Sequence, residues 1–311
     1  MKVVGVDLGG TKLAAALVVE GRLSGTVNMP TDCAHGGEGV LLQIAQACRR
    51  VAFNNGMVME EIDAVGVATP GWVDERRGVI LSSANLPTAQ LAVADGLSAQ
   101  LDGRPVRVEN DANCAALGEQ VYGAARGERD ALVITVGTGI GSGVICRGAL
   151  LTGPGVAELG HTLLLLGGTL CGCGRRGCCE AYCSASALMR MGKEALAAHP
   201  HSSLAQGAIK GETIFACARE GDETARRVLE QYFYYFSEML MNFVNMLRPH
   251  VILIGGGVAN AGNDFFVPLR KRFTMVARAN TYGVELPSIL PAALGNAAGI
   301  LGAAALFTKE K

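Results

Sequence analysis

The stretch Glu109-Asn110-Asp111-Ala112-Asn113 carries the side chains with the greatest capacity for chemistry. A β-like run at residues 106–108 precedes it, and residues 114–119 follow with a composition typical of a helix. A carboxylate at such a strand-to-helix corner lies at the rim of a sheet, near free backbone N–H groups, where open α/β folds bind their ligands. Asp111 is therefore a candidate functional residue. The structural alternative is that Asp111 or Asn113 only caps the helix.

A glycine-rich turn lies before this corner. Residues 2–7 form a short apolar strand, residues 8–12 turn tightly, and residues 13–19 return as a second apolar strand. The pattern predicts a β-hairpin with a further turn at residues 20–22, and it lacks the Gly-Lys-Ser/Thr signature of a P-loop.

The residues of this turn suit a phosphate group. Gly9 and Gly10 let the backbone approach closely, and the hydroxyl of Thr11 can donate a hydrogen bond to a phosphate oxygen. Asp7 can hold a hydrated Mg²⁺. A plain hairpin turn would also explain the two glycines.

A second hairpin repeats the layout. Residues 131–136 form a strand, Gly137-Thr138-Gly139-Ile140-Gly141 a turn, and residues 143–146 a returning strand. Gly137 follows Gly9 by 128 positions (137 − 9), and Gly148 follows Gly21 by 127 (148 − 21), so the spacing indicates a duplicated domain. The second turn lacks the third glycine of a dinucleotide fingerprint and opens no helix, which excludes a Rossmann site. Two facing glycine hairpins suit a nucleotide held between two lobes.

Three closely spaced cysteines indicate a metal site. Cys171, Cys173 and Cys178 are separated by glycines, and His161 lies ten residues before the first of them. A Cys₃His set suits tetrahedral zinc, and four protein ligands leave no position for water, so the zinc would be structural. The alternative is a set of free thiols in a glycine-rich loop.

The same loop reaches two acidic residues. Zinc would pin the segments that carry Glu158 and Glu180 beside one pocket. Cys179 and Cys183 exceed what one zinc ion requires, and we interpret both as packing residues.

The composition limits the classes of function that the chain can have. The 311-residue chain is 50% hydrophobic, enough for a large core in two lobes, and its net charge of −1 offers no footprint for nucleic acid. Asp7 interrupts the first apolar run, so no signal peptide is expected, and residues 292–307 are too few to span a membrane. Five of the ten cysteines lie between Cys171 and Cys183, which indicates metal binding in a reducing compartment, the cytoplasm.

The remaining pattern predicts the elements that position these residues. Helices are expected at residues 38–54, 91–101, 112–122, 225–247 and 296–307, and strands at residues 64–68 and 251–254. Gly71 ends one strand, and the amide of Asn85 either binds a polar ligand or closes a turn. At residues 255–257 a third glycine turn lets the backbone approach an adenine or a ribose.

Taken together, these motifs resemble the ROK family of sugar kinases, and within it the bacterial glucokinases, over the whole chain. The zinc motif with its upstream Glu-Leu-Gly-His is highly specific to that family. The resemblance implies an α/β fold of the actin-like (ribonuclease H-like), duplicated, two-lobed ATPase type. Its small lobe would comprise residues 1–115 and 296–311, and its large lobe residues 116–295 with a zinc-binding loop at 161–180.

The resemblance also implies the role of each candidate residue. Asp111 would be the catalytic base. The residues that hold the sugar would be Gly71, Asn85, Asn110, Asp111, Glu158, His161 and Glu180. Those that approach ATP and its Mg²⁺ would be Asp7, Gly9, Gly10, Thr11, Lys12, Gly137, Thr138, Gly139, Gly256 and Gly257. The zinc ligands would be His161, Cys171, Cys173 and Cys178.

The implied activity is ATP-dependent phosphorylation of the primary hydroxyl of a hexose, with glucose the first expectation. The alternatives are a kinase for an N-acetylated hexosamine such as N-acetylmannosamine or N-acetylglucosamine, a kinase for another hexose such as fructose or allose, and a sugar sensor without activity. A homo-oligomer, dimer or tetramer, is expected, with no nucleic-acid or membrane partner.

Four positions, in three segments, depart from the family pattern. Val156-Ala157 stands where Ala-Gly is usual, Thr88 where Gly is common, and Cys179 where an apolar residue is common. The first two segments lie beside the expected sugar pocket and bear on which hexose fits. Family repressors carry a DNA-binding domain before the first hairpin, and this chain begins at that hairpin, so an enzyme is expected.

Overall fold

The computed structural model describes residues 1–83, 86, 89–278 and 285–308 of the 311-residue chain. The chain divides into two compact units. Unit 1 comprises Met1–Arg129, Gly143–Ala157 and Ala293–Lys311, and unit 2 comprises Asp130–Ser142 and Glu158–Ala292. This division places the whole helix that begins at Asp111 in unit 1. The lobe boundaries expected from the sequence, at residues 115 and 296, remain a prediction.

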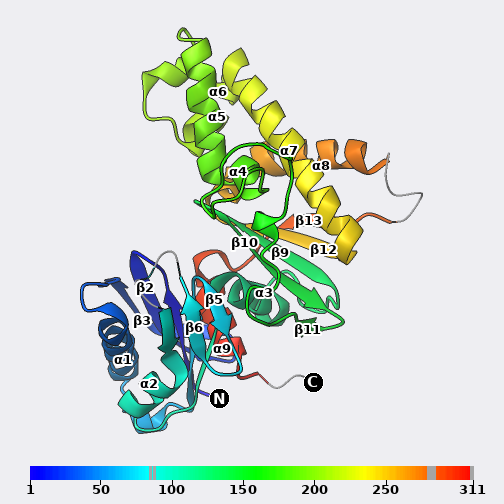
Figure 1. Ribbon diagram of the computed structural model, residues 1–311. Helices are drawn as coiled ribbons and strands as arrows, with labels where there is room; N and C mark the ends of the chain where they lie inside the picture. Colours follow the sequence, from blue (N-terminus) through cyan, green and yellow to red (C-terminus); the bar gives the residue numbers. More distant parts are fainter. Residues whose placement is uncertain (84–85, 87–88, 279–284, 309–311) are drawn as a thin grey trace. The chain divides into compact units, whose positions relative to one another are not determined.

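Two five-stranded sheets repeat one topology (Figure 1). The first has the order β3-β2-β1-β4-β8, with β1 (Val3–Leu8), β2 (Lys12–Val19), β3 (Arg22–Pro30), β4 (Ala64–Thr69) and β8 (Val106–Asn110). The second has the order β11-β10-β9-β12-β13, with β9 (Ala131–Val136), β10 (Ile140–Cys146), β11 (Ala149–Leu150), β12 (Val251–Gly255) and β13 (Ser288–Pro291). In each sheet an antiparallel arm continues into two parallel strands. The duplication predicted from the two hairpins is confirmed.

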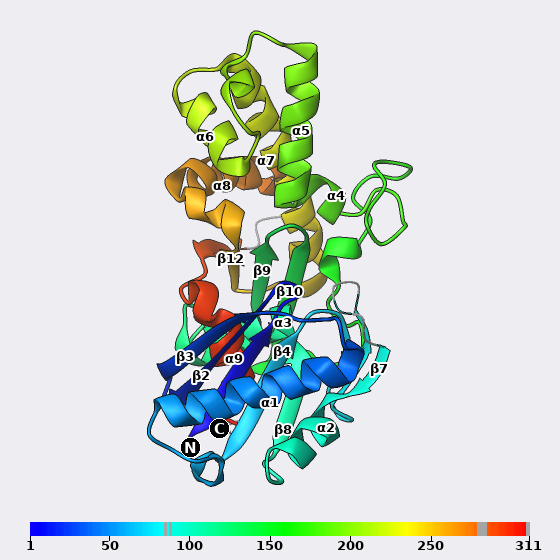
Figure 2. The ribbon, with the colours of Figure 1, turned by 90° about the vertical axis from the view of Figure 1, so that its left-hand side faces the viewer.

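Helices cover both faces of the first sheet. On one face lie α1 (Gly36–Asn54), the short η1 (Met59–Glu61) and α2 (Val93–Gln100), and on the other lie α3 (Asp111–Tyr122), the short η5 (Gly295–Ala297) and α9 (Ala298–Ala305) (Figure 2). The central strands β1 and β4 are apolar up to Asp7 and Thr69 near their carboxyl ends, as expected for a sheet buried on both faces. Gly5 and Gly66 let the backbone of α9 approach the sheet so closely that a Cβ at either position would overlap a carbonyl oxygen of the helix.

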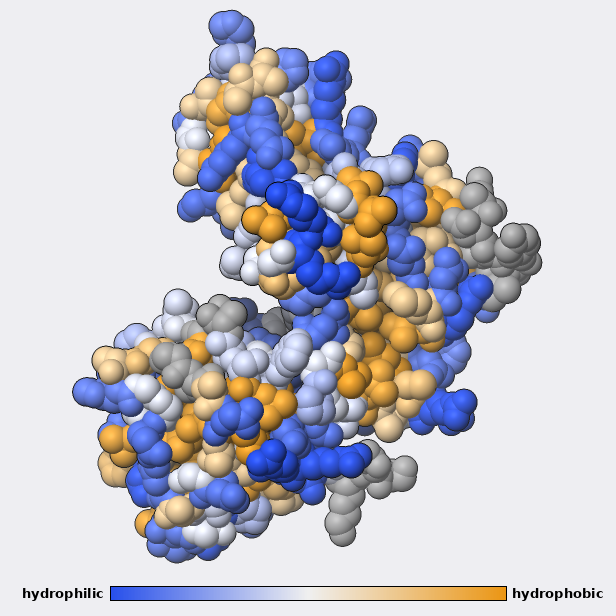
Figure 3. Space-filling model, viewed as in Figure 1, coloured by the Kyte–Doolittle hydropathy of each residue, from blue (hydrophilic) through white to orange (hydrophobic). Residues whose placement is uncertain are grey.

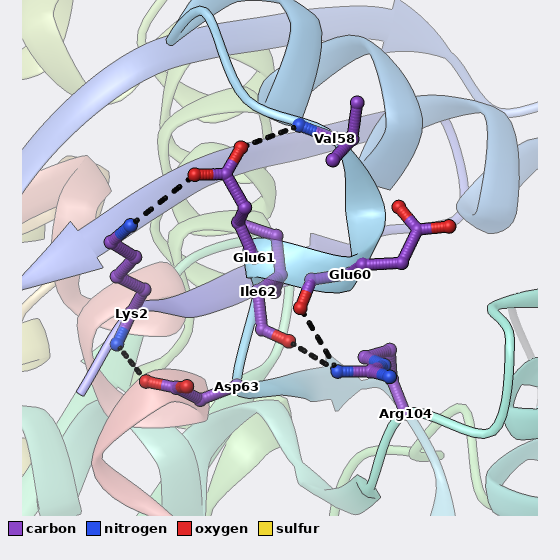
Figure 4. Close-up of polar contacts among 7 residues, drawn as sticks. All are labelled: Lys2, Val58, Glu60, Glu61, Ile62, Asp63 and Arg104. Carbon is purple, nitrogen blue, oxygen red and sulfur yellow. Dashed lines mark hydrogen bonds and ion pairs between the residues drawn. The ribbon is translucent and has the colours of Figure 1, made fainter.

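Polar contacts hold the amino ends of the parallel strands (Figure 4). The backbone N–H of Lys2 donates to Asp63 Oδ2 at 2.7 Å, and the Lys2 ammonium lies 3.9 Å from Glu61. Arg104 donates to the carbonyls of Glu60 and Ile62 at 3.2 and 3.3 Å. The candidate functional residues lie at the opposite, carboxyl edge of this sheet.

A small sheet, order β5-β6-β7, was not expected from the sequence. It consists of β5 (Trp72–Asp74), β6 (Val79–Ser82) and β7 (Ala89–Ala92). The helix predicted at residues 91–101 therefore starts too early, because Leu91 and Ala92 pair with β6 and α2 begins at Val93. The strands of this small sheet are short and partly exposed. They have no run of alternating apolar residues by which the sequence could predict them.

Unit 2 joins the second sheet to a group of helices. These are η2 (Leu159–His161), α4 (Glu180–Cys183), α5 (Ala185–Ala198), η3 (Ser203–Gln206), α6 (Gly211–Arg219), α7 (Glu223–Leu247), η4 (Gly257–Ala261) and α8 (Asn263–Arg278). The predicted helix 225–247 is confirmed as α7, whose Phe233 and Phe236 stack on Phe265 of α8. Burial is not complete, since Tyr234 and Met246 lie on an exposed strip.

Candidate functional site

Three carboxylates gather at the carboxyl edge of the first sheet. Asp7 of β1 pairs in register with Ala68 of β4, which in turn pairs with Glu109 of β8, so the two acids share one row of the sheet. Asp111 follows directly at the start of α3. Burial raises the pKa of the Cys114 thiol, and the charges of Glu109, Asp111 and Asp7 raise it further. The three carboxylates therefore lie at the same edge of the sheet, which suits a hydrated cation or a proton acceptor.

The helix cap at this corner is Asn110. Its Oδ1 accepts from the backbone N–H groups of Ala112 (2.9 Å) and Asn113 (3.2 Å), and its Nδ2 donates to the carbonyl of Gly71 at 3.1 Å. The sequence alternative, that Asp111 or Asn113 caps the helix, is wrong because Asn110 already occupies that position. Asp111 is exposed, and its Oδ1 accepts from Ala112 N at 2.8 Å.

Below the cap lies a buried acid that the sequence did not single out. Glu109 is 3% exposed, and its Oε1 accepts from the N–H of Asn110 (2.7 Å) and from Nδ2 of Asn113 (3.1 Å). Burial raises the pKa of Glu109, whereas the hydrogen bonds from Asn113 and Asn110 lower it. The sequence placed Glu109 at the start of the stretch 109–113 and gave it no role of its own.

The first glycine turn is closed by its own backbone. Gly9 N donates to the carbonyl of Lys12 at 2.8 Å, and the hydroxyl of Thr31 donates to the carbonyl of Gly9 at 2.7 Å. Burial raises the pKa of Asp7, and the nearby Lys12 lowers it. The side chains of Thr11 and Lys12 are exposed, which leaves them available to a ligand.

In unit 2 the second glycine turn contacts Glu180. Gly137 N donates to the carbonyl of Gly139 at 3.0 Å, and Ile140 N donates to Glu180 Oε2 at 3.0 Å. A Cβ at Gly139 would overlap the Glu180 carboxylate. The sequence assigned Gly139 to the nucleotide and Glu180 to the sugar, and the structure places the two in contact.

The third glycine turn packs on the same strand end. Gly256 has φ +88°, and a Cβ there would overlap the backbone of Val136. The carbonyl of Gly137 accepts from Ala185 N at 2.9 Å, at the start of α5. Two glycine turns and a helix start thus meet in unit 2.

A pocket of about 620 Å³ opens beside them. It combines apolar side chains with a few charged and polar groups, as small-molecule sites do. Its lining residues are Ala185, Met189, Lys210, Gly211, Glu212, Phe215, Ala216, Arg219, Gly257, Val258, Asn260, Ala261 and Asp264. Sequence reasoning found only Gly257 among them, because the others come from four separate helical segments with no shared motif.

The predicted metal ligands converge. One ligand atom from each of His161, Cys171, Cys173 and Cys178 lies within 4.8 Å of the other three. The Sγ atoms of Cys173 and Cys178 are 3.7 Å apart, and Cys171 Sγ lies 3.7 Å from Nδ1 of His161. Two thiolates bound at about 2.3 Å to a tetrahedral zinc are roughly 3.8 Å apart, so the donor set and its spacing fit zinc.

Neighbouring groups orient these ligands. Arg175 donates to the carbonyl of His161 at 3.0 Å, and the Cys171 thiol donates to Glu180 Oε1 at 3.4 Å. A backbone hydrogen bond from Arg175 lowers the pKa of Cys173. Cys179 lies outside the set, with its Sγ 3.3 Å from the hydroxyl of Thr162.

Glu158 lies at the start of η2, close to these ligands in sequence. Its carbonyl accepts from His161 N at 3.0 Å. Burial raises the pKa of Glu158, the charge of His161 lowers it, and Glu180 raises it again. Glu158, His161 and Glu180 therefore interact electrostatically. The sugar-binding roles of these residues remain predictions, and Asn85 lies outside the described residues.

In the part of the chain that the structure describes, no helix is long and apolar enough to cross a membrane. Hydrophilic and hydrophobic residues are interspersed over the face shown in Figure 3.

Comparison with known proteins covers the whole chain. The model of the ROK family matches residues 3–310. A glucokinase from Thermotoga maritima is 36% identical, with 100% of this chain and 98% of the relative covered. An N-acetylmannosamine kinase from Shigella boydii is 31% identical, with 100% of both chains covered.

Solved structures give the same result. A ROK hexokinase from Thermus thermophilus has a TM-score of 0.83 at 40% identity and covers 98% of this chain and 97% of its own. A ROK family glucokinase from Streptomyces griseus, in complex with glucose and AMPPNP, has a TM-score of 0.83 at 35% identity, with 98% and 99% covered. The actin-like fold predicted from the sequence is confirmed. The chain belongs to the ROK family.

Proposed function

We propose that this protein phosphorylates the primary (6-) hydroxyl of a hexose with ATP, and that glucose is its principal substrate. The observation that carries the proposal is the full-length similarity to glucokinases, 33–36% identical over 97–100% of this chain. The Cys₃His cluster and the three acids at the edge of the first sheet support it.

Asp111 is the base in this proposal. Phosphoryl transfer depends on placement and charge neutralisation more than on covalent chemistry, so the enzyme needs one proton acceptor beside the attacking hydroxyl. Asp111 accepts that proton, and the hydroxyl oxygen attacks the γ-phosphorus of ATP in line while the bond from the γ-phosphorus to the β–γ bridging oxygen breaks and ADP leaves. Its exposure at the first position of α3 leaves the carboxylate accessible to a substrate.

The nucleotide binds to the glycine turns and the pocket of unit 2. Gly137, Thr138 and Gly139 contact the phosphates, and Gly256 and Gly257 lie at the nucleoside, beside the pocket that Met189 and Phe215 line. From unit 1, Gly9, Gly10, Thr11 and Lys12 contact the phosphates as well. Asp7 would hold the water shell of Mg²⁺, which supplies charge neutralisation for the transferred group.

The sugar is held by hydrogen bonds from Gly71, Asn85, Asn110, Glu158, His161 and Glu180. Zinc, held by His161 and the three cysteines, supplies rigidity to the segment that carries them. His161 Nδ1 faces Cys171, so its other ring nitrogen is left for a sugar hydroxyl. We further propose that the protein acts in the cytoplasm, where thiols stay reduced, as a homo-oligomer.

A coupled ADP-release assay tests the proposal across glucose, mannose, fructose, allose, N-acetylglucosamine and N-acetylmannosamine. We expect the highest kcat/KM with glucose, because a missing or inverted hydroxyl leaves a buried partner without its hydrogen bond. The N-acetylmannosamine kinase relative at 31% identity supports the second candidate. A higher kcat/KM with an N-acetylated hexosamine would establish that alternative, and no turnover with any sugar would indicate a sensor.

A further inference from the structure

Two acidic side chains stand out for their burial among the described residues. Glu109, near the end of β8, is 3% exposed, and Glu119, in the second half of α3, is 0% exposed. A buried carboxylate is tolerated only with hydrogen-bond partners, so the partners indicate what each acid does. Glu119 accepts from the backbone N–H groups of Ala124 and Leu294, both at 2.8 Å, and thus joins two segments of unit 1.

Glu109 has different partners. One oxygen, Oε1, accepts from the N–H of Asn110 and from the side-chain amide of Asn113, at 2.7 and 3.1 Å. These two residues flank Asp111, one before it and one a half-turn after it. Through this oxygen the end of β8 is tied to the first turn of α3.

Stability alone does not favour this arrangement. Burial raises the pKa of Glu109, and the charge of Glu75 adds to the effect. The Oδ1 atom of Asn113 is buried and finds no hydrogen-bond partner among the described residues. An apolar pair of similar size would avoid both penalties, and local arrangements that stability disfavours are typical of functional sites.

We propose that Glu109 is a positioning residue for Asp111: its buried carboxylate fixes the backbone on both sides of the base and so sets the direction of the Asp111 carboxylate. This proposal rests on the function proposed above. A misplacement of about 1 Å at a reacting group can reduce a rate by about 10²-fold, so the tie matters to catalysis as well as to folding.

The test compares Glu109→Ala, Glu109→Gln and Asn113→Ala with the matched control Glu119→Ala, which removes the buried acid of α3. For each we would measure kcat and KM with glucose and ATP, the Kd of glucose by calorimetry, and the melting temperature. We expect Glu109→Ala to lower kcat by about 10²-fold, with a smaller change in the Kd of glucose. Glu109→Gln keeps an oxygen that accepts both hydrogen bonds and should recover a large part of the lost kcat.

The control and the partner variant separate positioning from stability. Glu119→Ala should lower the melting temperature while the folded protein keeps its kcat. Asn113→Ala should lower kcat in the same direction as Glu109→Ala, and the double variant should lose less than the product of the two effects. If Glu109→Ala does not fold, Asn113→Ala carries the test. Equal kcat losses in Glu109→Ala and Glu119→Ala, or an unchanged kcat in Glu109→Ala and Asn113→Ala, would overturn the proposal.

Hydrogen exchange gives a readout that needs no activity. Loss of the Glu109 tie should speed amide exchange in residues 110–113, whereas Glu119→Ala should speed it near Ala124 and Leu294. Wild-type protein that phosphorylates no sugar would refute the proposed function, yet exchange at residues 110–113 would still show whether Glu109 holds this corner. Unchanged exchange there in Glu109→Ala would refute the tie itself.

Discussion

Asp111 and its neighbours have different structural roles where β8 joins α3. Asn110 caps α3, Glu109 and Asn113 are buried beneath the cap, and Asp111 alone of the four is exposed. Asp111 Oδ1 accepts from Ala112 N at 2.8 Å, and an asparagine at this position keeps a side-chain oxygen that can accept the same hydrogen bond.

Asp111→Asn should lower kcat by at least about 10²-fold, because the amide keeps the shape but cannot accept the proton. The Kd of glucose should change much less. Steady-state kinetics and calorimetry measure the two quantities, and Asp95→Asn, which changes an exposed acid of α2 in the same unit, serves as the control. A near wild-type kcat in Asp111→Asn would remove Asp111 from the mechanism.

Ala157 adopts an unusual backbone conformation. Its φ is +62°, in the left-handed region that favours glycine, and the family pattern usually has glycine at this position. Ala157→Gly should therefore raise the free energy of unfolding by about 0.5–1 kcal/mol, since the Cβ strain exceeds the added entropy of the unfolded chain. Ala197→Gly, in the exposed part of α5, should lower it by a similar amount. Chemical denaturation compares the two, and a destabilised Ala157→Gly would contradict the strain argument.

At the scale of single residues, the sequence was most informative where a chemical function requires certain residue types at short spacing. The sequence grouped the three cysteines and the histidine that the structure brings together, and their role as zinc ligands stays a prediction. The alternative that Asp111 or Asn113 caps the helix was wrong, since all three residue positions hold good caps and the residue at which the helix begins decides between them. The tie from Glu109 to Asn113 depends on burial, which the local pattern does not reveal.

Among the elements, the loop at residues 161–180 has little regular structure of its own. Its order comes from the ligand cluster and from a few ties, such as the donation of Thr169 N to the Tyr182 hydroxyl at 2.6 Å. Glycines at 172, 174 and 177 add backbone freedom. Without a metal this loop should lose its conformation, and Glu180 at its end should move.

Elemental analysis should find one zinc per chain, and Cys173→Ala should lose it together with sugar phosphorylation. ATP binding at the pocket lined by Met189 and Phe215 should survive, as measured by calorimetry. Cys146→Ala, which removes an exposed cysteine outside the cluster, should leave zinc content and activity unchanged. Zinc-free protein with full activity would refute the structural role of the cluster.

The elements predicted best were the long, periodic ones. Helix α1 and the two hairpins have clear apolar periods, and the structure has them close to the expected bounds. The sheet of β5, β6 and β7 was missed because its strands hold three or four residues each. The pocket of unit 2 could not be predicted from the sequence, because it forms only when separate helices pack together.

At the scale of the whole molecule, α9 holds unit 1 together. It packs on β1, β4 and α3, and Gly302 meets the backbone of Cys114 so closely that a Cβ would overlap it. Helix α9 comes from the far end of the chain, yet the sheet it covers begins at Val3. Small residues at these contacts allow α9 to pack closely against β1, β4 and α3.

Gly302→Ala should lower the free energy of unfolding by about 1–3 kcal/mol, the usual effect of overpacking a closed contact. Gly207→Ala, at a glycine with open space around it, should change it by less than about 0.5 kcal/mol. Urea denaturation measures both. Equal free energies of unfolding in the two variants would show that α9 can shift away from α3 without a loss of stability.

The late position of α9 also has a consequence during translation. Unit 1 is assembled from three stretches, and its last stretch, Ala293–Lys311, leaves the ribosome after all of unit 2. Until then one apolar face of β1 and β4 lacks the cover of α9, while Asp130–Ser142 and Glu158–Ala292 can already fold. The nascent chain therefore exposes its first-made sheet longest, and a chaperone that binds apolar strands should hold the protein up to the moment its final helix emerges.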